Sequence, residues 1–291
     1  VGTVVHTGDF KVDYTPVFGD AIDLQRFAEI GKKGVLAMMS DSTNAEKPGF
    51  TASERTVGVT FDHLFAEHVN SRIIIATFAS NVDRVQQIIS SAYKYGKKVV
   101  VEGRSMVNII ETASELGYLD VPKNTLIQID ELKNYPDEKT VLITTGSQGE
   151  SMAALSRMAA DIHKKVSIKP GDTVIFSSNP IPGNEKSVSK VINDLIKKGA
   201  NVIFQDAHVS GHAHQEEIKL IYSLVHPQYS IPIHGEFRHR MAQKELAESL
   251  GIPKENVIML HTGDVLEIGF GDKSVKVEIT RIVETTKKDE A

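Results

Sequence analysis

Histidine is concentrated in one part of this chain. Of its 11 histidines, six lie between His208 and His239, and three of these surround a Ser-Gly pair at 210–211. This loop directly follows an apolar run at 201–204 and precedes a helical pattern. The loop after a parallel strand is where ligand-binding groups collect, and the free N–H groups of a following helix attract an anion. We therefore favour a site with imidazoles, a hydroxyl and an anion cradle over an ordinary polar turn.

Three more residues follow apolar runs and have side chains that bind metals. His234 lies in Pro-Ile-His-Gly-Glu, which is either a site or a strand-to-helix turn whose Glu caps the helix. Asp9, in Thr-Gly-Asp, is either a turn residue or a metal ligand. Asp41, in Ser-Asp-Ser-Thr-Asn, belongs either to a helix-capping cluster or to the same site. Neutral imidazole and carboxylate are both zinc ligands.

Two glycine-rich loops, at 144–150 and 176–184, also follow apolar runs. Their glycines, hydroxyls and exposed N–H groups are suited to a phosphate. Neither ends in the Gly-Lys-Ser/Thr of a Walker motif. A polar loop with a helix cap is an equal alternative for each of them.

Composition limits the class of protein that carries these loops. The chain has 291 residues, enough for roughly two domains. With 41% hydrophobic and 24% charged residues it is globular. A net charge of -5 excludes a surface that is cationic all over. Any nucleic acid must therefore be bound by local basic patches or by bound metal. The absence of cysteine excludes disulfides and thiolate sites and fits a cytoplasmic location. No apolar run approaches the roughly 18 residues that span a membrane.

The elements that position these loops alternate between strand and helix from about Ser71 to Leu260. Apolar runs predict strands at 72–78, 98–101, 141–144, 173–176 and 201–204. Helical spacing follows at 82–95, 106–116, 152–163, 188–198, 215–225 and 238–249. Uniformly apolar strands indicate an α/β fold with a mostly parallel sheet. The flanks are richer in predicted strands, at 1–6, 34–39, 257–260, 264–268 and 274–280, so we expect a middle domain inserted into a flanking one.

The order of the motifs resembles one family. The chain carries TGDFK at 7–11, SDSTN at 40–44, ASN at 79–81, EGRSM at 102–106, TGSQGE at 145–150, SGHAH at 210–214 and PIHGE at 232–236. This set, which extends over nearly all of residues 1–270, is similar to the ribonuclease J family of metallo-β-lactamase/β-CASP nucleases. The resemblance implies a partial metallo-β-lactamase fold with an inserted β-CASP α/β domain.

The domain boundaries follow from this resemblance. Residues 1–52 are expected to form the first segment of the metallo-β-lactamase domain and residues 53–197 the β-CASP domain. The second metallo-β-lactamase segment is then 198–280, followed by a polar tail at 281–291.

The resemblance also implies a role for each candidate residue. Asp9 would bridge two metal ions, and His234 would ligate the second of them. His212 would lie near the scissile phosphate as a proton donor or transition-state stabiliser. Asp41 is the acidic residue that would support a metal-ligating histidine. The nucleotide phosphate would be held by His208, Ser210, Gly211 and Ala213.

The activity implied is metal-dependent hydrolysis of RNA, as a 5′-to-3′ exonuclease and an endonuclease, in RNA processing and decay. Two zinc ions would activate a water for attack on phosphorus. The expected substrate is single-stranded RNA with a 5′ monophosphate. The expected assembly is a homo-oligomer or a hetero-oligomer with a paralogue, without a membrane partner. Two alternatives stay open, namely a β-CASP nuclease acting on DNA and a non-catalytic fragment that binds RNA or a partner.

One departure from the family concerns the metal ligands. The motif His-x-His-x-Asp-His is absent from this chain, as is a further histidine ligand, and by the resemblance both would precede Val1. We therefore expect this chain alone to hold fewer than two zinc ions, or none, and to be inactive. Metal analysis combined with an RNA cleavage assay checks this. Two zinc ions per chain together with turnover would contradict it.

Overall fold

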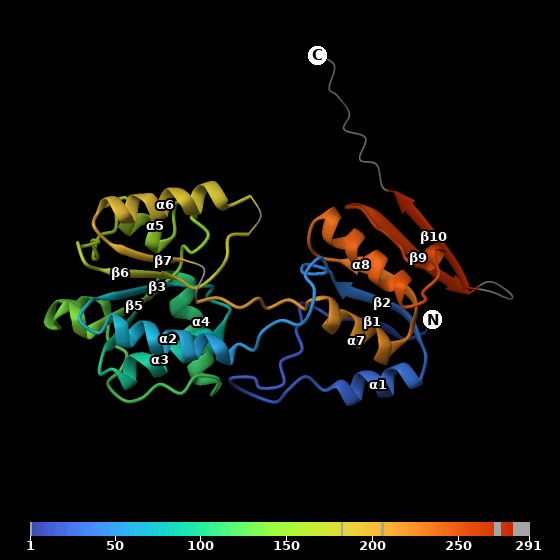
Figure 1. Cartoon of the computed structure of the whole chain (residues 1–291), viewed down its shortest axis with the longest axis horizontal. Helices are drawn as coiled ribbons and strands as arrows, with labels where there is room; N and C mark the ends of the chain where they lie inside the picture. Colours follow the sequence, from blue (N-terminus) through green and yellow to red (C-terminus); the bar gives the residue numbers. More distant parts are fainter. Residues whose placement is uncertain (1, 182, 205–206, 271–274, 282–291) are drawn as a thin grey trace, which may run out of the picture. The chain divides into compact units, whose positions relative to one another are not determined.

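The computed structural model describes residues 2–181, 183–204, 207–270 and 275–281. The chain divides into two compact units, which are described separately here (Figure 1). The first unit contains residues 1–14, 20–51 and 210–291, and the second contains residues 15–19 and 52–209. The expected domain boundaries near 52 and 197 stay a prediction, and the second unit runs on to Val209. Except for Arg281, the predicted tail lies outside the described residues.

The second unit is built on a five-stranded parallel sheet with the order β4-β5-β3-β6-β7. Its strands are β3 (Ile73–Ala76), β4 (Lys98–Glu102), β5 (Thr140–Thr144), β6 (Thr173–Phe176) and β7 (Asn201–Phe204). The central strand β3 is buried along its whole length. It is covered on both faces, which explains why the run Ile-Ile-Ile-Ala is uniformly apolar. The predicted α/β architecture is confirmed.

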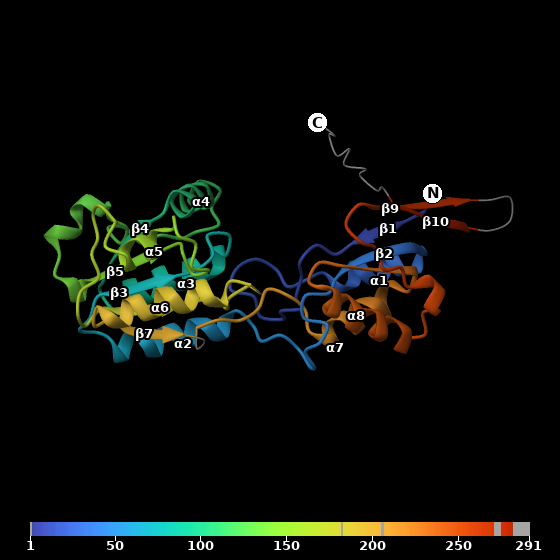
Figure 2. The ribbon, with the colours of Figure 1, turned by 90° about the horizontal axis from the view of Figure 1, so that it is seen from above.

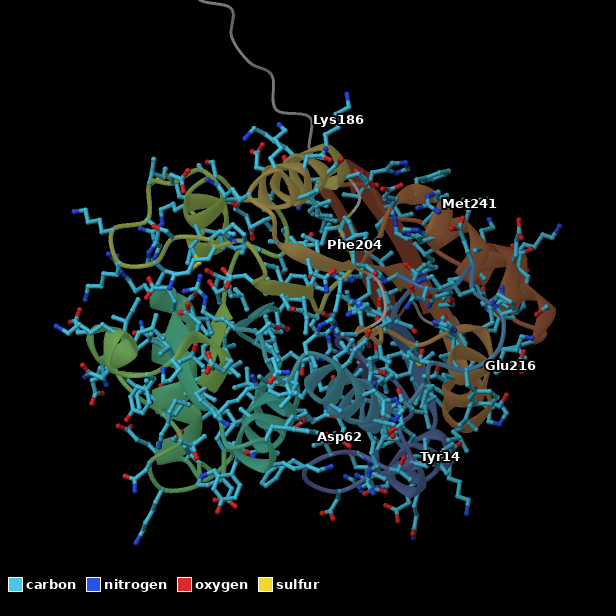
Figure 3. All side chains as sticks on the ribbon, turned by 60° about the vertical axis from the view of Figure 1, so that its left-hand side comes forward. Tyr14, Asp62, Lys186, Phe204, Glu216 and Met241 are labelled. Atoms are coloured by element: carbon cyan, nitrogen blue, oxygen red, sulfur yellow. The ribbon has the colours of Figure 1, made fainter. Side chains whose placement is uncertain are left out.

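Helices cover both faces of this sheet (Figure 1). They are α2 (Arg55–Glu67), α3 (Val82–Lys94), α4 (Arg104–Glu115), α5 (Ala154–Ala159) and α6 (Glu185–Lys197). Ile73 and Ile75 face a core shared with α2, α3 and α4. Ile74 faces the other core, shared with α5 and α6. Phe204 lies against this second core, whereas Lys186 points outward from α6 (Figure 3).

The first unit has a parallel sheet of three strands in the order β1-β2-β8. These are β1 (Val4–His6), β2 (Val35–Asp41) and β8 (Pro227–Ile233). One face packs on α1 (Leu24–Lys32), α7 (Gln215–Val225) and α8 (Phe237–Ser249). The other face packs on β9 (Asp264–Phe270), which pairs with β10 (Val275–Arg281) in an antiparallel hairpin (Figure 2). None of the described helices is long and apolar enough to cross a membrane.

Three local expectations differ from the structure. The predicted strand at 257–260 is wrong, because a 3-10 turn at Lys254–Asn256 precedes it and only Val257 forms a bridge, to Ser230. The helix predicted at 152–163 is shorter, since Asp161 has a φ of 58° and ends it. Helices α1 and α2 were not predicted; none of the residues of α1 is fully buried, whereas α2 buries Val57, Phe61 and Phe65.

A buried ion pair joins two neighbouring strands of the second unit. Arg72 and Asp172 are each 3% exposed and precede β3 and β6. Arg72 Nε donates to Asp172 Oδ1 at 2.9 Å, and Nη2 donates to Oδ2 at 2.5 Å and to the Ser167 carbonyl at 2.7 Å. Such a pair is costly to break because the remaining charge stays buried.

We therefore expect Arg72→Met to lower the free energy of unfolding by roughly 3–5 kcal/mol. Urea denaturation followed by circular dichroism measures this. The control is Lys94→Met, which removes the exposed pair with Asp62 and should change stability little. Equal effects of the two substitutions would contradict the importance of the buried pair.

Candidate metal centre

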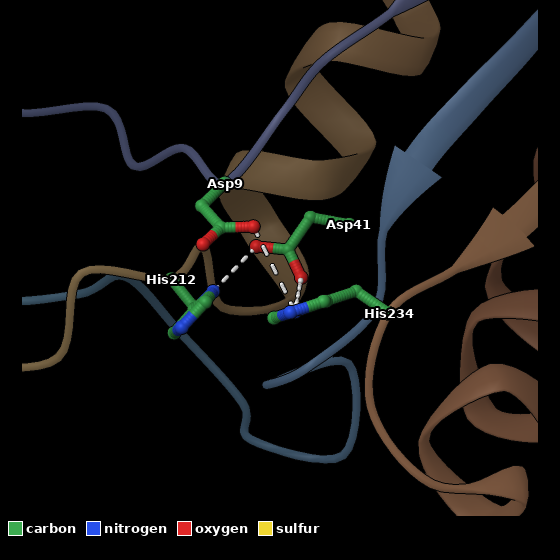
Figure 4. Close-up of side chains that lie close together, drawn as sticks. All are labelled: Asp9, Asp41, His212 and His234. Atoms are coloured by element: carbon green, nitrogen blue, oxygen red, sulfur yellow. Dashed lines mark hydrogen bonds and ion pairs between the residues drawn. The ribbon is translucent and has the colours of Figure 1, made fainter.

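Four side chains of the first unit converge on one point. The ligand atoms of Asp9, Asp41, His212 and His234 all lie within 4.8 Å of one another (Figure 4). Asp9 follows β1, Asp41 ends β2, and His234 follows β8. Because these three parallel strands are neighbours, their carboxyl ends meet at one edge of the sheet. The structure thus brings together the residues assigned to metal binding and to catalysis, although their roles stay a prediction.

His212 reaches this edge by a different route from the one expected. Both His212 and His234 follow apolar runs in the sequence, from which one would expect them at the edge of one sheet. Their rings do stack, with centroids 5.3 Å apart. However, β7 belongs to the five-stranded sheet, whereas β8 belongs to the three-stranded sheet. His212 is carried to the site by the loop that leads into α7 of the first unit.

Asp41 is the buried centre of this group. Its side chain is 2% exposed, and its Oδ2 lies 2.7 Å from His212 Nδ1. Burial works to raise the pKa of Asp41, but hydrogen bonds from His212 and Thr43 outweigh it and hold that pKa below its usual 3.8. Asp41 is therefore a carboxylate that accepts, and His212 Nδ1 carries the proton between them. The histidine that Asp41 contacts by a direct hydrogen bond is His212, and its expected support of a metal-ligating histidine stays a prediction.

The same hydrogen bond controls the protonation of His212. It raises the pKa of the imidazole above the usual 6.5, against the opposing effect of burial and with help from the charges of Asp41 and Asp9. Lys47 acts weakly in the opposite direction. His212 is consequently a cation at a higher pH than a free histidine.

His234 is held by an unusual backbone turn. Its φ is 61° and that of Gly235 is 75°, so two consecutive residues are left-handed. A Cβ on Gly235 would lie 2.8 Å from His239 Nδ1, so a larger residue would also clash. Ser42 Oγ donates to the carbonyls of Ile233 and His234 at 2.7 and 2.5 Å. The turn therefore places a half-exposed ring beside both carboxylates.

The residues assigned to a phosphate belong to both units, and their role stays a prediction. Ser210 Oγ accepts hydrogen bonds from Asn44 Nδ2 at 2.7 Å and from the His212 N–H at 3.1 Å. Ala213 is 2% exposed and packs in the core, whereas Gly211 is exposed. His208 belongs to the second unit, where its Nδ1 lies 3.2 Å from Arg84 Nη1.

The anion cradle expected at the start of α7 is wrong. Three N–H groups at this end already have acceptors within the protein. His214 N donates to Glu217 Oε2 at 2.9 Å, Gln215 N to the Lys47 carbonyl at 3.0 Å and Glu216 N to the Gly49 carbonyl at 3.1 Å. A helix end whose donors are satisfied and which carries a carboxylate does not attract an anion.

Sequence reasoning also missed Glu217, which organises the loops around the site. It is 0% exposed. Its Oε1 accepts from Val12 N at 2.7 Å, and its Oε2 accepts from Thr51 N at 2.6 Å as well as from His214 N. Three chain segments are thereby fixed by one carboxylate. The spacing of His214 and Glu217 is that of a capping box, which is the signal that was available.

The donor set fits a zinc ion. Carboxylate oxygen and imidazole nitrogen are ligands that zinc takes in proteins. Asp9 and His234 have side chains that are 63% and 52% exposed, so both can be reached by an ion. Asp41 differs, because both of its oxygens accept hydrogen bonds from protein groups. Asp9 and His234 are therefore the residues that would hold a metal.

Comparison with known proteins agrees with this geometry. Residues 70–195 match the model of the "Ribonuclease J, beta-CASP domain". Residues 200–259 match the "Zn-dependent metallo-hydrolase RNA specificity domain". The chain belongs to the ribonuclease J family.

Ribonuclease J proteins of several bacteria are similar over most of this chain. That of Helicobacter pylori strain B128 is 49% identical over 271 residues, which are 92% of this chain and 39% of the relative. That of Synechocystis is 46% identical over 276 residues, 94% of this chain and 43% of the relative. Ribonuclease J2 of Bacillus subtilis is 43% identical over 280 residues, which are 95% of this chain and 50% of the relative. The chain thus spans half or less of these curated relatives.

A solved structure shares the fold. The crystal structure of a protein of unknown function from Enterococcus faecalis V583 matches with a TM-score of 0.59 at 18% identity. The match covers 89% of this chain and 56% of that protein. At this identity the similarity concerns the fold alone.

The contact between Asp41 and His212 gives a prediction for the metal-free protein. Asp41→Asn should lower the pKa of His212, because the hydrogen bond to Asp41 is the largest cause of its elevation. NMR titration of the His212 ring measures this shift. Asp9→Asn is the matched control and should lower the pKa less, since Asp9 acts on His212 only through its charge. An unchanged His212 pKa in Asp41→Asn would contradict the assignment.

The free energy of unfolding should depend on pH through the same Asp41–His212 pair. A histidine whose folded pKa is raised contributes stability that is full below about pH 6.5 and is lost as the pH rises through the folded pKa. Asp41→Asn should therefore cost more unfolding free energy at about pH 6 than at about pH 9. Urea denaturation at the two pH values tests this.

Proposed function

We propose that this protein acts in the hydrolysis of RNA phosphodiester bonds as a metal-dependent ribonuclease. The observation that carries the proposal is the Asp41–His212 pair beside the exposed Asp9 and His234. In this arrangement His212 would be a proton donor beside two side chains that fit zinc, which supports the proposal. The relatives named ribonuclease J and the match to an RNA specificity domain support RNA as the substrate.

The residues of this chain divide the chemistry among them. A bound zinc would supply an activated water and positive charge against the phosphate. Asp9 and His234 would hold the metal. His212 carries its Nδ1 proton toward Asp41, so its Nε2 is the nitrogen that can give a proton to the leaving oxygen. Asp41 holds this ring in place and stabilises the imidazolium, as the raised pKa of His212 supports.

We further propose that the loop at 210–213 selects the 5′ end of single-stranded RNA. Ser210 Oγ accepts two hydrogen bonds, so its own proton is directed to neither of those partners. A hydroxyl donor beside His212, whose pKa is raised by its hydrogen bond to Asp41, suits a terminal monophosphate. By resemblance to the family, the proposal also includes His208, Gly211 and Ala213 as phosphate-binding residues, and 5′-to-3′ trimming in addition to internal cleavage.

The wider biology remains part of the proposal. The family supports a role in rRNA processing and mRNA decay, in the cytoplasm, as a homo-oligomer or with a paralogue. DNA is the rival substrate, and nothing in the described contacts reads the sugar. Competition between matched RNA and DNA strands decides between the two, and preferential cleavage of DNA would overturn the RNA assignment.

The roles of the two histidines can be separated in the intact enzyme. His212→Ala should reduce cleavage about 10²–10⁴-fold, the range for general acid catalysis, while the metal content stays unchanged. His234→Ala should lose part of the metal. His63→Ala, on the exposed surface of α2, is the control for the loss of a histidine. Zinc analysis measures the metal content of each variant, and an RNA cleavage assay measures its activity. Identical metal contents in all variants would refute the division of roles between His212 and His234.

The 5′ end provides a second test in the intact enzyme. RNA with a 5′ monophosphate should be degraded faster than RNA with a 5′ triphosphate, which is bulkier. Ser210→Ala should reduce this difference in degradation rate between the two RNAs. The reduction should correspond to roughly 1–3 kcal/mol of lost interaction energy if the hydroxyl contacts the charged phosphate. Internal cleavage of a circular RNA is the control and should be less affected. Equal rates on both 5′ ends, unchanged by Ser210→Ala, would show that this loop does not select the end.

A further inference from the structure

Thr43 lies between the buried carboxylate and the half-exposed histidine. Its Oγ1 is 2.7 Å from Asp41 Oδ1 and also 2.7 Å from His234 Nδ1. Its backbone N–H donates to the same Asp41 Oδ1 at 3.0 Å. One hydroxyl thus contacts two residues of the candidate metal centre.

Because the Thr43 hydroxyl has one proton, its hydrogen bonds with Asp41 and His234 can be arranged in one way. A hydroxyl has a single proton to donate and lone pairs with which to accept. Asp41 Oδ1 already accepts from the Thr43 N–H, and Oδ2 faces the His212 ring, so this carboxylate acts as an acceptor. Thr43 O–H therefore donates to Asp41, and Thr43 Oγ1 accepts from His234. The proton of the neutral His234 ring is then on Nδ1, and the lone pair is on Nε2.

Asp41 does not fix this ring by itself. Its Oδ1 is 3.5 Å from His234 Nδ1, which is beyond ordinary hydrogen-bond distance. The opposite arrangement, with Thr43 donating to His234, would leave the threonine oxygen 2.7 Å from a carboxylate oxygen without a proton between them. This would be repulsive, so the relay through Thr43 is required by the geometry.

We propose that Thr43 is a positioning residue that fixes His234 in the Nδ1–H tautomer and so leaves Nε2 as the nitrogen whose lone pair is available to a metal. One buried carboxylate then orients both histidines, His212 directly and His234 through the threonine hydroxyl. Groups that hold the far nitrogen of a ligating histidine set its tautomer and its basicity. Only the metal part of this inference depends on the proposed function.

The tautomer can be measured on the full chain without metal. Two-dimensional ¹H–¹⁵N spectra of the histidine rings, recorded where His234 is neutral, distinguish a protonated Nδ1 from a protonated Nε2. Wild type should show the Nδ1–H form of His234. Thr43→Val, which keeps the shape and removes the hydroxyl, should lose this preference, whereas Thr43→Ser should retain it. Thr60→Val, on α2, is the matched control and should behave as wild type.

Metal affinity gives a second readout. Titration of the intact enzyme with zinc alone should show a roughly 10–100-fold weaker affinity in Thr43→Val, with recovery in Thr43→Ser. The raised pKa of His212 serves as the internal test that the loop is folded in each variant. If Thr43→Val fails that test, Thr43→Ala is used in its place.

The inference is overturned if wild-type His234 carries its proton on Nε2. It is also overturned if a folded variant without the hydroxyl keeps the wild-type tautomer, or if Thr43→Ser behaves as Thr43→Val. Failure of the intact enzyme to cleave RNA, with the tautomer pattern as expected, would refute the proposed function and leave this inference standing.

Discussion

The buried charge of Asp41 is the constraint on which the site depends. A carboxylate that is 2% exposed must be compensated by donors, because an unpaired buried charge is costly. The donors here are the His212 ring and both polar groups of Thr43. The orientations of His212 and His234 thus follow from the need to satisfy one charge. This links the stability of the site to its chemistry.

The sheet brings these groups together, and a second carboxylate keeps them there. The neighbours β1, β2 and β8 carry Asp9, Asp41 and His234 to one edge without any further loop structure. His212 has no strand to place it. Its loop is instead fixed by Asn44, which binds Ser210 Oγ and the His212 carbonyl, and by Glu217. The part of the site outside the sheet therefore rests on buried side chain–backbone hydrogen bonds.

These two modes of placement explain what the sequence could predict. Strands such as β3, buried on both faces, are read from apolar runs, and the loops after them identify Asp9, Asp41 and His234. The density of histidines found His212, although the reasoning about its sheet was wrong. Thr43 and Glu217 were missed because both are ordinary capping residues in sequence. Their partners His234 and Thr51 are 191 and 166 residues away, and only the fold brings them into contact.

Two carboxylates of the same cluster have opposite surroundings, and this assigns them different functions. Asp41 is buried, and protein donors occupy both of its oxygens. Asp9 is 63% exposed, with His234 Nδ1 at 3.7 Å as its neighbour in the cluster. A carboxylate saturated by fixed donors orients other groups, whereas one open to solvent is able to exchange water for a cation. Asp9 and Asp41 place two acidic groups together in a chain whose net charge is -5, and a cation held at Asp9 would offset this negative charge where it is concentrated.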